Sequence, residues 1–220
     1  MLLETVIGLE IHAELKTNTK IFCSCSTEFG AKPNENTCPV CLGIPGTLPV
    51  LNEEVVNLAI KAGKAVNCKI NNYNKMDRKN YQTSQYDLPM CVDGMVNFTY
   101  EGKEVSVRIN RIHIEEDAGK LVHLEDEPVS LIDYNRAGVP LVEIVTEPDL
   151  RSPEEAAEFM RQLKGILEYA DISDCRMEQG SIRCDANISL RPYGSEEYGT
   201  KVEIKNINSF REVQKALERE

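Results

Sequence analysis

The chain opens on a segment in which apolar and polar side chains alternate with a period of two. The segment is VIGLEIHAEL, residues 6–15, and in a β-strand its successive side chains point to opposite faces. One face carries the apolar side chains of Ile7, Leu9 and Ile11. Glu10 and His12 share the other face, about 7 Å apart at roughly 3.3 Å per residue. The pattern predicts a strand over residues 4–16 that has a core face and a polar face.

The same period recurs along the chain and predicts further strands. They cover residues 95–100, 105–114, 120–124, 130–134, 140–145, 183–190 and 201–207. Their polar faces are rich in charged and amide side chains, namely Arg111, His113, Glu115, Asp117, Glu143, Glu147, Arg183, Asp185, Asn187, Lys201, Glu203 and Lys205. Any half-exposed antiparallel strand alternates in this way, so no single strand identifies a site. The recurrence in several strands indicates a shared polar surface.

Three segments follow the helical period instead. Residues 52–67 are amphipathic, begin with an asparagine suited to an N-cap, and carry acidic residues in the first turn. Residues 152–170 begin with S-P-E-E, a capping box with proline at the first helical position. The last segment, residues 209–220, opens with a second capping box and ends without a C-cap signal, as expected of a fragment of a longer protein.

Strands outnumber helices, and hairpin turns join several of them. The pattern therefore predicts an α+β fold with a mostly antiparallel sheet and interspersed helices. Such a sheet can line a wide concave surface on one face while helices cover the other. The length of 220 residues, of which 41% are hydrophobic, allows one or two domains with a substantial core.

Charge and hydropathy narrow the class of protein. The net charge of −11 argues against broad binding of nucleic acid, because phosphate contacts need a basic surface. An acidic chain can still bind phosphates when metal ions lie between them and its carboxylates. No apolar run reaches the ~20 residues of a membrane span, and the N-terminus lacks the pattern of a signal peptide. We therefore expect a cytoplasmic protein without a membrane partner.

Four of the eight cysteines form a compact pattern. C-S-C at residues 23–25 and C-P-V-C at residues 38–41 flank a polar, turn-rich insert. A reducing cytosol disfavours disulfides, and four thiolates suit tetrahedral zinc. The pattern predicts a structural zinc loop over residues 22–45, with disulfides or unliganded thiols as the alternatives. Its ligands would be Cys23, Cys25, Cys38 and Cys41. The scattered remainder is typical of small buried apolar residues: Cys68, Cys91, Cys175 and Cys184.

The polar strand faces together favour metal-dependent phosphate chemistry. Mg²⁺ prefers oxygen ligands and shares its coordination shell with substrate phosphates. Arginine and lysine on the same faces would meet those phosphates and the charge that develops as a phosphoryl group moves. Both the P-loop signature and the Rossmann fingerprint are absent from the sequence. Alternation and spacing take the prediction no further than this class.

Longer motifs resemble one family. They are VIGLEIHAEL, DRKNY, SQYDLP, RIHIEEDAGK, DYNRAGVPLVEIVTEPD, MEQGSIRCDANISLRPYG and KVEIKNINSFREVQKALE. In this order they resemble the GatB/GatE family, the B subunits of the tRNA-dependent amidotransferases, from about residue 5 to the end. The resemblance covers the family's catalytic cradle, whose fold resembles the catalytic sheet of glutamine synthetase. It implies one cradle domain over residues 1–220, truncated at its C-terminal end and without the family's C-terminal helical and tail domains.

The resemblance also implies an activity. Members of the family are carbon–nitrogen ligases that use ATP and Mg²⁺ to phosphorylate the side-chain carboxylate of glutamate on tRNA(Gln) or aspartate on tRNA(Asn). Ammonia that an amidase releases from glutamine then displaces the phosphate. The implied partners are the amidase (the A subunit), the small C subunit of a heterotrimer, and the misacylated tRNA, which binds mainly through the missing domains. The cysteine pattern resembles a zinc-binding subset of the family.

Site residues follow from the same motifs. The resemblance implies Mg²⁺ ligands at Glu10, His12, Glu116, Glu143, Asp185 and Glu203. All of these except Glu143 are also implied as catalytic residues. Nucleotide or phosphate contacts are implied at Arg183 and Lys205, with Lys79 and Arg111 as further candidates. Alternation places Glu116 on the face opposite to Glu115, whereas the family motif favours Glu116; a β-bulge would change the parity.

The sequence departs from the family after Tyr81. There the family carries an aromatic, proline-rich stretch of the FYPDLPKGY type, whereas this chain runs KNYQTSQYDLP directly. Either the stretch is deleted, which would remove part of the substrate-binding loop around Lys79–Gln85, or it is a disordered segment that the sequence omits. The intact flanks favour the second alternative.

Two other classes of protein stay open. One is a different carboxylate-activating ATPase with the same sheet that acts on a small molecule, and a requirement for a tRNA-borne carboxylate would separate it. The other is a zinc-bearing assembly module without enzymatic activity. Loss of complex formation with intact chemistry after replacement of Cys38 would favour docking. The sequence does not distinguish glutamyl-tRNA from aspartyl-tRNA as the substrate.

Overall fold

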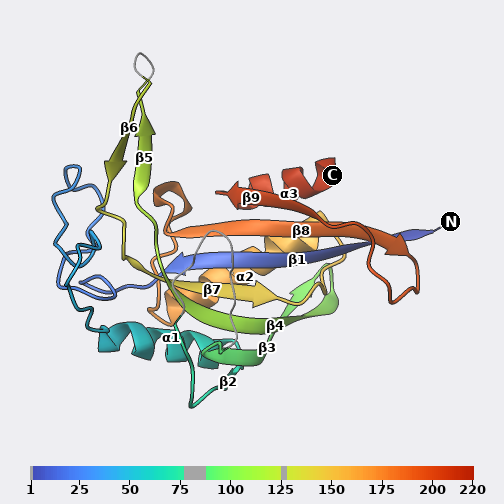
Figure 1. Ribbon diagram of the computed structural model, residues 1–220. Helices are drawn as coiled ribbons and strands as arrows, with labels where there is room; N and C mark the ends of the chain where they lie inside the picture. Colours follow the sequence, from blue (N-terminus) through green and yellow to red (C-terminus); the bar gives the residue numbers. More distant parts are fainter. Residues whose placement is uncertain (1, 77–87, 125–127) are drawn as a thin grey trace.

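The computed structural model of the protein describes residues 2–76, 88–124 and 128–220. Within these ranges the α+β prediction is confirmed: the larger of two sheets has seven strands in the order β2-β3-β4-β7-β1-β8-β9, and all neighbouring strands are antiparallel (Figure 1). The strands are β1 (Leu3–Glu14), β2 (Lys69–Ile70), β3 (Cys91–Tyr100), β4 (Lys103–Glu116), β5 (Lys120–His123), β6 (Ser130–Asp133), β7 (Pro140–Thr146), β8 (Ile182–Pro192) and β9 (Val202–Ile207). The helices are α1 (Glu53–Ala65), α2 (Pro153–Tyr169), α3 (Phe210–Arg219) and the short 3-10 helix η1 (Met177–Gln179).

The three α-helices begin where their capping residues predict. The Asn52 side chain accepts a hydrogen bond from the amide of the second helical residue of α1, at 3.0 Å. Ser152 and Ser209 accept from the amides of Glu155 and Glu212, both at 3.1 Å. The Glu155 carboxylate accepts from the amide of Arg151 rather than from that of Ser152, so the predicted capping box closes one residue earlier. Each cap satisfies an amide that has no partner within its helix.

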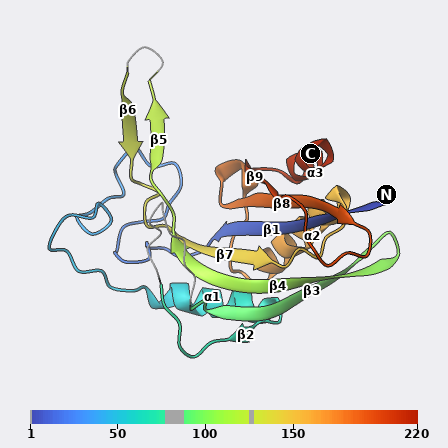
Figure 2. The same cartoon turned by 45° about the vertical axis from the view of Figure 1, so that its right-hand side comes forward.

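The apolar face of the sheet and the helices form one core. On this face Ile7, Leu9 and Ile11 of β1 are at most 1% exposed. The α2 side chain Phe159 is fully buried, and its ring centroid lies 6.4 Å from that of Phe98 on β3. In both views α2 lies behind the central strands of the sheet (Figures 1 and 2). The opposite face of the central strands is therefore left for polar side chains.

A tight turn and a separate hairpin complete the fold. Glu101 and Gly102 have φ values of 49° and 76° and join β3 to β4, as a two-residue hairpin turn requires. The strands β5 and β6, both expected from the sequence, pair only with each other and project from the body (Figure 2). The short elements β2 and η1 were not predicted. No helix in the described ranges combines the length and apolar character that crossing a membrane requires.

Candidate functional site

The strand register places four polar residues in one row across the sheet. His12 of β1 is paired with Glu143 of β7 on one side and with Arg183 of β8 on the other. Glu143 is paired in turn with His113 of β4. Directly paired residues in antiparallel strands point to the same face with Cβ atoms about 5 Å apart. The row lies on the face opposite to the helices, as the alternation in the sequence predicts.

His12, Glu115 and Glu143 form a buried cluster on this face. The Nε2 atom of His12 lies 3.7 Å from Oε2 of Glu115 and 3.7 Å from Oε1 of Glu143. One ligand atom from each of the three residues lies within 4.8 Å of the others. Their exposed fractions are 7%, 8% and 2%. Two carboxylates buried side by side are costly unless positive charge compensates them, so the cluster fits a divalent cation.

The donor atoms narrow the choice of cation. The separations of 3.7 Å exceed the length of an ordinary hydrogen bond and suit ligands that share one ion. Carboxylate oxygens are the donors that Mg²⁺ prefers. An imidazole nitrogen also suits Mn²⁺ and Zn²⁺. The residues therefore fit the implied Mg²⁺ through their oxygens, and a transition metal would gain from the histidine.

A cavity is lined by Glu10, which lies two residues before His12 along β1. It has a volume of about 310 Å³, and the residues that line it include Gly8, Val145, Pro148 and Tyr198. Nδ2 of Asn187 donates to Oε1 of Glu10 at 3.2 Å. The Oδ1 atom of Asn187 is buried and has no hydrogen-bond partner within the described part of the chain. A buried acceptor without a partner at the edge of a cavity is available to a ligand. Asp185, the strand partner of Glu10, accepts from the amide of Asn206 at 2.7 Å.

Arg183 is held by a carboxylate that the sequence placed on the polar face without a role. Its Nη2 atom lies 3.2 Å from Oδ1 of Asp117, and Nε of Arg136 lies 3.5 Å from Oδ2. Asp117 is 5% exposed. Glu14 belongs to the same group, and its pKa is raised to about 7, chiefly by burial and further by the negative charge of Asp117, against the nearby arginines. The pair of arginines makes Asp117 a buried anchor that orients Arg183 beside His12.

The structure separates Glu115 from Glu116. They are successive residues of β4 in unbroken register with β7, so their side chains point to opposite faces. The one irregularity in this strand pair lies earlier, at Ile109–Arg111, and does not change the parity at Glu115. Glu115 therefore joins His12. Oε1 of Glu116 lies instead 3.8 Å from where a Cβ atom on Gly138 would be. The geometry thus places Glu115 where the family motif favoured Glu116.

Other predicted residues lie outside the cluster. Glu203 and Lys205 are exposed on β9, at the edge of the sheet, and Nζ of Lys205 lies 3.4 Å from Oε1 of Glu203. Arg111 is half-buried and lies in the row of Glu10, separated from it by Val145. Lys79 and the flanks of the stretch missing after Tyr81 lie outside the described residues.

Comparison with known proteins shows the family of the chain. The catalytic domain of the GatB/GatE family matches residues 5–220. The chain belongs to the GatB/GatE family. It is 74% identical to the B subunit of the aspartyl/glutamyl-tRNA(Asn/Gln) amidotransferase of Clostridium beijerinckii over 226 residues, which cover 99% of this chain and 47% of that protein. A B subunit of the same enzyme from Clostridium acetobutylicum is 72% identical over the same shares, and that of Thermoanaerobacter pseudethanolicus is 61% identical.

This GatB/GatE chain spans about half the length of the curated relatives it matches. The matched regions run over 226 residues, more than the 220 of this chain. The relatives therefore carry residues in this region that this chain lacks.

In this GatB/GatE chain the four clustered cysteines also converge. Their sulfur atoms all lie within 4.8 Å of one another. The Sγ atoms of Cys38 and Cys41 are 3.9 Å apart, close to the spacing of about 3.8 Å that Zn–S bonds of 2.3 Å give in a tetrahedron. The amide of Cys38 donates to Sγ of Cys41 at 3.1 Å. Amide donation from Cys41 lowers the pKa of the Cys38 thiol to about 7, whereas burial raises that of Cys25. The predicted ligand set thus fits zinc.

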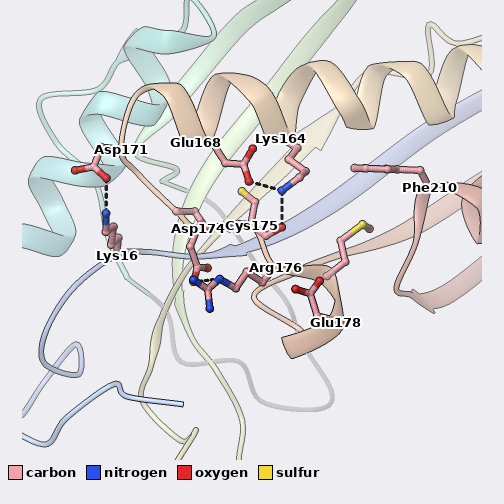
Figure 3. A pocket seen from close by; sticks show the side chains of 11 residues that line it. Lys16, Lys164, Glu168, Asp171, Asp174, Cys175, Arg176, Glu178 and Phe210 are labelled. Carbon is pink, nitrogen blue, oxygen red and sulfur yellow. Dashed lines mark hydrogen bonds and ion pairs between the residues drawn. The ribbon is translucent and has the colours of Figure 1, made fainter. Parts of the chain in front are cut away.

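A larger cavity of about 560 Å³ lies beside the C-terminal end of α2 (Figure 3). Six of its charged side chains form three ion pairs, Lys16–Asp171 at 2.6 Å, Arg176–Asp174 at 3.3 Å and Lys164–Glu168. Nζ of Lys164 also donates to the carbonyl of Cys175 at 3.0 Å. These paired charges already compensate one another. Of the described residues, neither group that could bind a metal ion lines this cavity. The candidate functional site of this GatB/GatE chain is therefore the one around His12.

Proposed function

We propose that this chain is the ATP-dependent kinase part of a tRNA amidotransferase. Its substrates would be ATP and the side-chain carboxylate of glutamate on tRNA(Gln) or aspartate on tRNA(Asn). The names of the relatives support the substrate class. The observation that carries the proposal is the buried cluster of His12, Glu115 and Glu143, on the same sheet face as Glu10, which lines a cavity. A sheet architecture like that of glutamine synthetase is part of the same proposal.

The proposed reaction has two steps. A carboxylate is a poor electrophile, so one of its oxygens first forms a bond to the γ-phosphorus of ATP, and the bond from that phosphorus to the departing ADP oxygen breaks. Ammonia then attacks the carboxyl carbon of the acyl phosphate, inorganic phosphate leaves, and loss of a proton gives the amide. The ammonia would come from glutamine through the amidase, the A subunit of the assembly, with a small C subunit completing it.

The residues of this chain have separable roles in the first step. A divalent cation held by His12, Glu115 and Glu143 would neutralise the two anions that must meet. Arg183, oriented by Asp117, binds phosphate oxygens through its planar guanidinium group. Glu10 and Asn187 border the cavity that accepts the nucleotide, whose volume lies at the lower end of the range for ligand pockets.

The proposal is tested with the complete enzyme and no ammonia source. ADP release is followed with and without glutamyl-tRNA(Gln), in the wild type, Glu143→Gln and the control Glu104→Gln. Glu104 is exposed at the start of β4, and its carboxylate accepts a hydrogen bond from the hydroxyl of Thr99. We expect release that depends on charged tRNA, a loss of at least about 100-fold in Glu143→Gln, equal to about 3 kcal/mol, and no change in the control. Wild-type release from Glu143→Gln would refute the site.

A docking role for the cysteine loop has its own support. Residues 36–52 contain no Asp, Glu, Lys or Arg, in a chain with a net charge of −11. Several of their apolar side chains are exposed, Leu48 by 84% and Val50 by 76%. Exposed apolar patches mark protein–protein contacts. We expect Cys38→Ser to weaken assembly of the full-length complex in size-exclusion chromatography while charged-tRNA-dependent ADP release by the assembled fraction persists; unchanged assembly would contradict docking.

A further inference from the structure

Lys20 is among the largest fully buried side chains of the described residues, with an exposed fraction of 0%. Its Nζ atom lies 2.7 Å from the carbonyl oxygen of Asn36, 3.1 Å from that of Tyr134 and 3.6 Å from Sγ of Cys41. A lysine ammonium group has three donors and no acceptor. The three contacts therefore use its whole donor capacity. A cation buried to this degree is costly unless its hydrogen bonds and its charge are both compensated.

The three acceptors differ in what they can supply. Asn36 and Cys41 belong to the cysteine loop, whereas Tyr134 follows β6 at the base of the β5–β6 hairpin. The two carbonyl oxygens carry no net charge, so the Cys41 sulfur is the one of the three that can be an anion. Four thiolates around one Zn²⁺ leave two uncompensated negative charges. The Lys20 ammonium lies where one of them would be compensated.

The backbone around this contact fixes its geometry. The amide of Ile21, next to Lys20, donates to the carbonyl of Gly138 at 2.9 Å. Gly138 has a φ of 83°, and a Cβ atom there would lie 3.6 Å from Cδ of Lys20 and 3.8 Å from Cβ of Cys41. The Asn36 amide also donates to Oδ1 of Asn135 at 2.9 Å, which ties the cysteine loop to the same segment. The Lys20 stem is thus packed between the loop and the segment that follows β6.

We propose that Lys20 is a positioning residue of the four-cysteine centre. Its buried ammonium compensates the metal-bound thiolate of Cys41 and links the loop to the base of the β5–β6 hairpin. The inference rests on the proposed zinc site. It gives a role at that site to Lys20, which is not one of the four cysteine ligands that the sequence predicts. Partners of this kind, outside the ligand set, typically change metal affinity by about 10–100-fold.

A purely structural role for Lys20 makes a different prediction. If Lys20 only anchored the carbonyls of Asn36 and Tyr134, its replacement would lower stability and leave the metal–thiolate bonds as they were. If it compensates the thiolate, replacement weakens metal binding and alters the thiolate-to-metal charge-transfer absorption of the Co²⁺-substituted centre. Zinc affinity and Co²⁺ absorption therefore separate the two roles without any measurement of catalysis.

The experiment uses the full-length protein in its native assembly, stripped of zinc and titrated against a competing chelator. The variants are Lys20→Met, Lys20→Gln and the control Lys32→Met, and Cys38→Ser defines the zinc bound by the cysteine centre. Lys32 lies in the same loop, is exposed, and its replacement changes the net charge equally. We expect one cysteine-dependent zinc in the wild type, about 10–100-fold weaker binding in both Lys20 variants, and wild-type binding in the control.

Each outcome decides a different point. Wild-type zinc affinity and unchanged Co²⁺ absorption in the Lys20 variants would overturn the role of Lys20 and leave the zinc site standing. The absence of cysteine-dependent zinc from the wild type would overturn both. Should Lys20→Met fail to fold, Lys20→Gln decides alone, because its amide still donates hydrogen bonds but lacks the charge. Equal weakening in Lys32→Met would also overturn the inference, since net charge would then explain the effect.

Discussion

Glu115 and Glu116 provide a matched pair for testing the assignment of the site. Replacing either with glutamine removes one negative charge from adjacent positions of the same strand, with nearly the same change in volume. Because their side chains point to opposite faces, only Glu115 lies beside His12 and Glu143. We expect Glu115→Gln to weaken the metal dependence of ADP release strongly and Glu116→Gln to leave it almost unchanged.

The size of the effect follows from the cluster. Two unit charges 4 Å apart attract by about 4 kcal/mol at an effective dielectric constant of 20. A divalent ion beside Glu115 is attracted more strongly, and water and the neutral amide replace part of the loss. A net loss of only half the unit-charge value, about 2 kcal/mol, weakens metal binding about 30-fold. We therefore expect the half-saturating Mg²⁺ concentration to rise at least about 30-fold in Glu115→Gln, and less than about 3-fold in Glu116→Gln.

The assay follows tRNA-dependent ADP release by the complete enzyme over a series of Mg²⁺ concentrations. Titration with Mn²⁺, observed by electron paramagnetic resonance, reports metal binding without turnover. The reverse result, with Glu116→Gln impaired and Glu115→Gln normal, would refute the assignment of faces and favour the motif-based choice. Equal impairment of both variants would show that charge near the strand end matters more than the direction of either side chain.

Four further predictions concern stability. The pKa of Glu14 is about 7 in the folded protein against 4.5 in the unfolded chain, so Glu14 favours folding below pH 4.5 and loses this contribution as the pH rises through 7. Between pH 4.5 and 8 this loss should lower the unfolding free energy of the wild type, measured with urea, by up to about 3 kcal/mol, and Glu14→Gln should abolish this decrease. An unchanged pH profile in Glu14→Gln would contradict the burial argument. Phe159→Ala should cost about 3–5 kcal/mol because Phe159 is fully buried, and a cost below 1 kcal/mol would contradict its core position. Ser152→Ala should cost about 1 kcal/mol through loss of the cap, with Ser195→Ala, which caps no helix, as control. Chelation of zinc should lower the thermal midpoint of the full-length protein, and added zinc should restore it; no shift would argue against a structural metal.

Local periodicity predicted most of the strands and helices and the direction of their side chains. The faces of β1 and the caps at Asn52, Ser152 and Ser209 depend on residues within one turn or one strand, so the sequence contains all that decides them. The alternation of side chains along the strand also placed Glu115 with His113 on the polar face. The choice of Glu116 came from motif resemblance, and it differs from the geometry because β4 has no bulge after Arg111.

Long-range packing lay beyond the sequence pattern. Lys20 reads as an ordinary surface lysine, and its burial depends on Tyr134, 114 residues further along the chain. The alternation in the sequence placed Asp117 on the polar face, but its two arginine partners come from separate segments of the chain. The hairpin of β5 and β6 has the alternation of a sheet strand, and only the register of the larger sheet shows that neither strand joins it.

The central position of β1 has a consequence for synthesis of the protein. Its partner β7 begins at Pro140, and the hydrogen bond from Asn187 of β8 to Glu10 spans 177 residues. A ribosome that adds about 5–20 residues per second makes β1 roughly 9–35 seconds before that part of β8. Throughout this interval one edge of β1 lacks its partner strand, and unpaired strand edges favour aggregation and the binding of chaperones. Of the described strands, the one that comes first along the chain is thus among the last to be paired on both sides.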